Sequence, residues 1–148
     1  MKIATIGILT ALILFGACNS KSLVKEEPVD SIQVAAGQSC YLYLSNKDTV
    51  KMTLTFDNQS VRGTLNYNIF EKDGNMGTIR GSIIGDTILA TYTFESEGVT
   101  SAREVAFLKK GNTLVEGFAP MDESGTHFAN RDELDFTGIV LNSTNCYE

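Results

Sequence analysis

The chain has 148 residues, of which 43% are hydrophobic, 9% aromatic and 20% charged, with three cysteines, one histidine and no tryptophan. This length suits one ordinary domain, and the normal apolar and aromatic content argues against a disordered chain. A net charge of −6 offers no basic surface for neutralising phosphates, so we expect no binding to nucleic acid.

The N-terminal residues 1–17 have the pattern of a signal peptide. Lys2 gives a positive start, and residues 3–17 form an uncharged apolar run. A membrane-spanning helix needs about 20 apolar residues, so this run is too short to be one. The run ends Leu-Phe-Gly-Ala before Cys18, and small residues directly before a cysteine resemble the lipobox of bacterial lipoprotein precursors.

The lipobox resemblance implies that Cys18 is acylated, with palmitate among the attached chains, and becomes the mature N-terminus. Phe15 departs from the pattern, because the family most often carries Leu three residues before the cysteine. Asn19 follows the cysteine where an Asp would signal inner-membrane retention, so the resemblance implies an anchor in the outer membrane of the cell envelope. An uncleaved anchor and a soluble secreted protein are the alternatives.

Residues 18–39 are expected to be a lipidated cysteine followed by a flexible tether, because residues 19–39 are polar, carry charges of both signs and contain Pro28. A short helix at 31–36 is the alternative reading of its last part. The remaining residues, 40–148, are predicted to form a single domain.

From Cys40 onward, apolar residues recur at every second position. Residues 49–56 alternate apolar side chains with Thr and Lys, which is typical of a half-buried antiparallel strand. The same alternation predicts strands over 61–69, 79–84, 87–94, 102–109, 113–119 and 134–141, separated by turn sequences such as Gly85-Asp86. A polar loop is expected over 120–131, with a short strand at 126–129.

This pattern predicts an all-β domain of eight or nine antiparallel strands in an up-and-down meander. The chain shows no helix long enough to cross over a sheet, so strands adjacent in sequence should pair. A closed or strongly rolled barrel would remove the unpaired edges, and glycines inside the strands, such as Gly63 and Gly81, would permit its curvature. A β-sandwich is the alternative.

Cys40 and Cys146 bracket the expected β-domain. With Cys18 used for lipid, these two thiols are the ones left to pair in an oxidising envelope. We therefore predict a Cys40–Cys146 disulfide, which requires the first strand and the C-terminal segment to be neighbours. Two unrelated reduced cysteines are the alternative.

The sequence contains no catalytic motif. His127 is the only histidine, and the chain has no Gly-x-Ser-x-Gly elbow, too few Cys and His ligands for zinc, and no EF-hand spacing. We therefore expect no enzymatic activity, no metal and no cofactor. Two alternatives remain open, namely a calcium site across the acidic segments 122–125 and 132–135, and a hydrolase with paired carboxylates drawn from Glu95, Glu97, Glu104 and Glu116.

Charged residues gather around residues 94–105. Arg103 and Glu104 are consecutive, so they must point to opposite faces of a strand. If Arg103 faces inward it needs a carboxylate partner, for which Glu95 and Glu116 are the candidates. The predicted function of this site is recognition of an anion or carboxylate at a barrel mouth, and the other ligand-binding candidates there are Arg62 and Arg80. A structural ion pair is the alternative.

The lipoprotein signal, the terminal cysteine pair, the small barrel and the segments 101–103 and 109–111 resemble the membrane-bound inhibitors of C-type lysozyme. The chain departs from that family in having no Trp and in carrying Glu104 where a Tyr would stand. The resemblance implies an inhibitor of a protein partner. Our first expectation is a lipid-anchored, non-enzymatic β-barrel that serves as a binding or structural module of the bacterial cell envelope.

Overall fold

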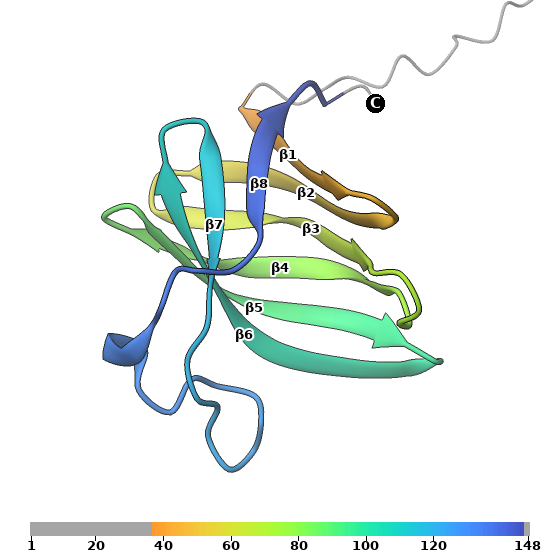
Figure 1. The fold of residues 1–148 in the computed structure, drawn as a ribbon. Coiled ribbons are helices and arrows are strands. Elements are labelled where there is room, and N and C mark those ends of the chain that lie inside the picture. The colour runs from red at the N-terminus through yellow and green to blue at the C-terminus, as the bar shows by residue number, and fades with distance from the viewer. Residues whose placement is uncertain (1–36, 147–148) are drawn as a thin grey trace, which may run out of the picture. The chain divides into compact units, whose positions relative to one another are not determined.

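The computed structural model describes residues 37–146, which form eight antiparallel strands and one short helix. The elements in order are β1 (Gln38–Ser45), β2 (Asp48–Asp57), β3 (Ser60–Asn68), β4 (Asn75–Ile84), β5 (Thr87–Ser96), β6 (Val99–Lys110), β7 (Thr113–Gly117), the 3₁₀ turn η1 (Arg131–Glu133) and β8 (Val140–Thr144). Each strand pairs with the next, and β8 pairs with β1 (Figure 1). The prediction of an all-β closed barrel of sequential strands is confirmed.

Side-chain alternation sets the register of the barrel. Val50 lies opposite Tyr67 and Met52 opposite Leu65, so the apolar faces of β2 and β3 both line the interior. Tight hairpin turns join most of the strands, and Gly85 takes a φ of 61° in the one between β4 and β5. Such turns need the left-handed region, which glycine enters without a Cβ penalty.

The interior is filled at its middle by large apolar side chains. The largest fully buried ones include Phe107, Met52, Leu54, Leu65, Ile79, Ile88, Leu114 and Leu141. Gly63 and Gly81 face the same interior, at positions where a Cβ would collide with the carbonyl oxygens of Thr53 and Leu89 on the neighbouring strands. A side chain would not fit between the strands at these two positions, and missing Cβ atoms permit tight curvature of the sheet.

The two ends of the domain are joined covalently. Cys40 and Cys146 form a disulfide with their Cα atoms 5.2 Å apart, and Cys40 lies opposite Thr144 in the β1–β8 ladder. The predicted bond is confirmed, and it closes the barrel at the seam between its first and last strands. The first strand begins at Gln38, within the segment that the sequence assigns to the tether.

The last part of the domain differs from the sequence prediction. A strand was expected over 134–141, but β8 begins only at Val140, and residues 118–139 form a long irregular connection. The Phe136 ring packs over Gly117, so the apolar residues that suggested a strand cover the outside of the barrel. The short strand expected at 126–129 is a single bridge between Met121 and Phe128.

The expected signal peptide, the lipidated Cys18 and the short helix at 31–36 lie outside the described residues. Within residues 37–146, no helix is long and apolar enough to cross a membrane.

Candidate functional site

The barrel wall opens where β6 continues past β7. Pairing between these strands ends at Ala106 opposite Gly117, while β6 extends back to Val99. The connection after β7 pairs with the free edge of β6 at one point, where the Glu104 N–H donates a 2.7 Å hydrogen bond to the Thr126 carbonyl oxygen. A cavity of about 220 Å³ lies at this point, between β6, β7 and the connection. Its walls include Arg103, Val105, Glu116, Phe118, Met121 and Phe128.

Arg103 belongs to the inner face of the barrel. It lies opposite Tyr92, whose side chain is fully buried in the core. Its guanidinium carbon lies 5.5 Å from the centroid of the Phe94 ring, a cation–π contact. Among residues 37–146, no hydrogen bond or ion pair joins the guanidinium of Arg103 to another side chain.

Glu116 brings a carboxylate to the same cavity. It is only 6% exposed, and its Oε1 accepts a 2.6 Å hydrogen bond from the Tyr67 hydroxyl. Burial raises the pKa of Glu116, whereas the Tyr67 hydrogen bond and the positive charge of Arg103 act against that rise. The pKa of the Tyr67 phenol is raised as well, first by burial and then by the charge of Glu116.

Tyr92 belongs to the same group of residues, which we call the inner cluster: Arg103, Glu116, Tyr67 and Tyr92. Its ring stacks on Phe94 with centroids 4.8 Å apart and meets Tyr67 edge-on at 6.0 Å. Burial raises the pKa of Tyr92 to about 12, with Arg103 opposing the rise. Its hydroxyl is buried without a hydrogen-bond partner among the described residues. Burying a hydroxyl without a hydrogen-bond partner costs roughly 1–3 kcal/mol of folding free energy.

Glu104 points to the opposite face of β6, as the consecutive Arg103 and Glu104 predicted. It is 8% exposed, because the β7–β8 connection covers it. Its carboxylate accepts hydrogen bonds from Arg131 Nη2 at 2.5 Å and from the Phe128 N–H at 2.9 Å. Glu104 therefore fastens the connection over the outer side of the cavity.

The structure brings together only part of the predicted site. Arg103 and Glu116 line one cavity, whereas Arg62 and Arg80 lie opposite each other on the exposed outer wall, and Glu95 is exposed beside Met76. The tyrosines Tyr67 and Tyr92 were missed as site residues, because in sequence they look like ordinary apolar positions of their strands. Only the closure of the barrel places β3 across from β7.

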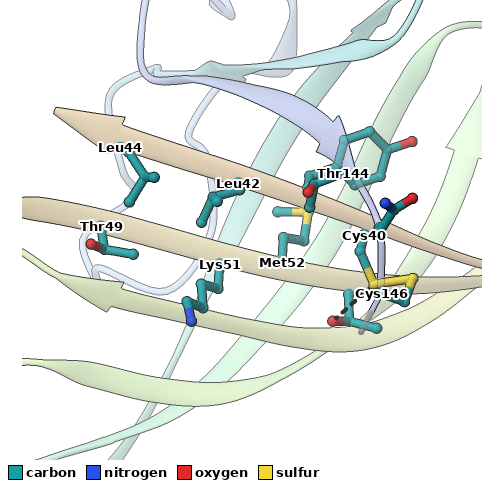
Figure 2. Close-up of a pocket in the computed structure, with 11 residues that line it drawn as sticks. Cys40, Leu42, Leu44, Thr49, Lys51, Met52, Thr144 and Cys146 are labelled. Carbon is teal, nitrogen blue, oxygen red and sulfur yellow. Dashed lines mark hydrogen bonds between the residues drawn. A yellow bond between two sulfur atoms is a disulfide. The ribbon is translucent and has the colours of Figure 1, made fainter. Parts of the chain in front are cut away.

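A second, larger hollow lies on the outer wall at β1 and β2, beside the disulfide (Figure 2). It encloses about 340 Å³ and is lined by the outward-facing Leu42, Leu44 and Lys51 together with Cys146. Leu44 and Lys51 are exposed, and among residues 37–146 Lys51 is the only charged residue in the lining. This hollow thus offers an apolar surface with one cation, without the opposed charges found at the Arg103 cavity.

The histidine loop does not gather ligands for a metal. His127 is 63% exposed, and its Nδ1 lies 3.6 Å from Asp122 Oδ2. A hydrogen bond from Ser124 and weaker ones from the backbone lower the pKa of Asp122. Within the part of the chain that the structure describes, no three His, Cys, Asp or Glu side chains come together as a metal site would require.

Comparisons with models of known protein families, with curated protein sequences and with solved structures found no match for this chain.

Proposed function

We propose that the protein is a lipid-anchored binding module of the bacterial cell envelope, without catalytic activity of its own, whose ligand occupies the cavity between β6 and β7. One observation carries the proposal. Arg103 and Glu116 supply opposite charges to one cavity, and no ion pair within residues 37–146 joins them. Buried charged groups are normally paired, so the buried Glu116 and the half-buried Arg103, which no ion pair joins, favour a ligand between them.

The inner cluster supports binding more than it supports acid–base chemistry. Glu104 also borders the cavity, but its carboxylate is held by Arg131 and by the Phe128 N–H. A carboxylate held in this way is poorly placed to act as the partner of Glu116 in glycoside cleavage, which needs two carboxyl groups free to face one bond.

Ligand binding can be tested by NMR. A library of small polar molecules is added to isotope-labelled full-length protein in detergent, and the amide shifts are followed. The proposal expects hits that move the amides of Arg103, Val105 and Gly117 while leaving those of Leu42 and Lys51 in place. If every hit maps to the outer hollow, or if no molecule shifts the β6–β7 amides, the binding function proposed for this cavity is wrong.

The anchor is proposed on the sequence pattern at Cys18. Intact mass of membrane-extracted protein should show a chain that starts at Cys18 and carries two or three acyl groups. Cys18→Ser should release the protein from the membrane fraction, with Ser20→Ala, which leaves Cys18 and the Cys40–Cys146 bond in place, as the control that should not. Continued membrane retention of Cys18→Ser would contradict the anchor.

Inhibition of a protein partner is a second candidate, favoured by the long connection 118–139. Several hydrogen bonds hold this connection in one conformation, including Ala129 N–H to the Pro120 carbonyl oxygen at 2.9 Å. A preorganised loop loses little entropy on binding an enzyme. A lysozyme assay with micromolar protein tests the idea, and unchanged turnover would remove it.

A further inference from the structure

The cavity between β6 and β7 also indicates what kind of ligand it takes. Resting on the binding function proposed above, we propose that it binds a free amino acid with an apolar side chain. Arg103 would hold the ligand's carboxylate, and Glu116 would hold its ammonium group. Each charge of the ligand would then meet an opposite charge of the protein.

The two charges of the site exclude ligands that carry only one. A simple carboxylate would be attracted by Arg103 but repelled by Glu116, and a simple amine would meet the reverse arrangement. A neutral molecule would leave both charged groups with no charged partner in direct contact. A zwitterion satisfies both, and a guanidinium can hold a carboxylate through two parallel hydrogen bonds.

An unused hydrogen-bonding group agrees with this assignment. Glu116 Oε1 is occupied by the Tyr67 hydroxyl, while no side chain within residues 37–146 donates to Oε2, which leaves that oxygen for an ammonium group. Tyr92 lies opposite Arg103 in the ladder, but it does not line the cavity, so its buried hydroxyl is not a contact for the ligand.

The remaining walls and the size of the cavity define the rest of the ligand. Val105, Phe118 and Phe128 give the cavity apolar walls, and Phe118 is 55% exposed at its rim. The volume of about 220 Å³ is below the roughly 300–1,000 Å³ typical of sites for drug-sized molecules. A ligand the size of a single amino acid with an aliphatic side chain suits this space.

Three probes with one carbon skeleton test the proposal. Leucine carries both charged groups, 4-methylpentanoate lacks the ammonium group and 3-methylbutylamine lacks the carboxylate. Calorimetric titration uses the full-length protein, purified from membranes in detergent, at neutral pH. We expect leucine to bind at least about tenfold more tightly than either analogue, since removing one ionic contact costs more than 1.4 kcal/mol.

Variants assign each contact. Arg103→Gln should weaken leucine binding about tenfold or more and abolish the preference for leucine over the amine, and Arg103→Lys should weaken binding less. Glu116→Gln should abolish the preference for leucine over the acid. Arg62→Gln, on the outer wall, is the matched control and should leave all three affinities unchanged. Circular dichroism confirms that each variant is folded, and Arg103→Lys keeps the test informative if Arg103→Gln fails to fold.

The outcomes separate this inference from the function on which it rests. Equal binding of leucine and 4-methylpentanoate, unaffected by Glu116→Gln, would overturn the amino-acid assignment and leave a carboxylate-binding module. No binding of any probe at millimolar concentration, combined with library hits at the β6–β7 amides, would also overturn the assignment alone. No binding and no such hits would overturn both.

Discussion

The Tyr67 hydroxyl on β3 donates a 2.6 Å hydrogen bond to the Glu116 carboxylate on β7, across the interior of the barrel. The two residues are 49 positions apart in sequence, and their strands are not neighbours in the sheet. The bond gives a buried carboxylate a donor that the adjacent strands do not supply. The bond therefore affects both the stability of the barrel and the pKa of Glu116.

Tyr67→Phe should destabilise the protein by about 1–3 kcal/mol at neutral pH, because the buried Glu116 carboxylate would lose its donor. The pKa of Glu116 should rise further, since this hydrogen bond lowers it. Urea unfolding measures the first effect, and an NMR titration of the Glu116 carboxyl carbon measures the second. Tyr43→Phe, at another half-buried inward tyrosine, is the control and should change stability much less. Equal losses in the two variants would contradict the role of the bond.

Glu116 should make the protein less stable as the pH rises. Its pKa in the folded state lies above the ordinary value of 4.5, so the folded chain holds the proton more tightly than the unfolded chain does. The contribution of Glu116 is therefore fully present below pH 4.5 and is lost as the pH rises through the folded pKa. Glu116→Gln removes this titration. The stability of the native protein relative to the variant should fall across that window and then level off, whereas a constant difference would contradict the prediction.

Reduction of the Cys40–Cys146 bond should lower the free energy of unfolding by about 4–5 kcal/mol, because the bond closes a loop of more than a hundred residues in the unfolded chain. Thermal and urea unfolding with and without reductant measure the change, with thiol counting to confirm complete reduction. The double variant Cys40→Ser/Cys146→Ser should reproduce the loss without reductant. An unchanged melting temperature after full reduction would contradict the prediction.

Gly63→Ala should destabilise the barrel by about 1–3 kcal/mol, because the new methyl group would collide with the Thr53 carbonyl oxygen, which is part of the β2 backbone and cannot swing away. Gly74→Ala is a matched control, since its methyl group would meet only the Tyr67 carbonyl oxygen at an ordinary 3.5 Å. The control should be nearly neutral or slightly stabilising. Similar melting temperatures for the two variants would show that the strands can move apart at Gly63.

Much of the fold was predictable because apolar and polar residues alternate along the strands of a half-buried sheet. The alternation of Val50, Met52 and Leu54 with polar residues fixes which face is buried, and the turn at Gly85 fixes one hairpin. The start of β8 was not predictable, because Leu134 and Phe136 are apolar although they belong to the connection before the strand. They lie over the outside of the wall, where an irregular chain can bury them as well as a strand can.

The site was predictable only in part. The adjacency of Arg103 and Glu104 determines that they face opposite sides, and this holds in the structure. Which carboxylate joins Arg103 depends on strand register and barrel closure, and no local pattern encodes either of them. For this reason Glu95 and Glu116 were equal candidates in the sequence, although only Glu116 reaches the cavity.

The position of the disulfide has a mechanical consequence. Tension that reaches the domain from its N-terminal side enters at Gln38, and Cys40 is the third residue of β1. Because Cys40 is bonded to Cys146, beyond the end of β8, a pull on β1 is transmitted at once to the last strand as well (Figure 2). The barrel therefore resists being unravelled strand by strand from that end, and peeling of β1 stops at Cys40 for as long as the bond stays oxidised.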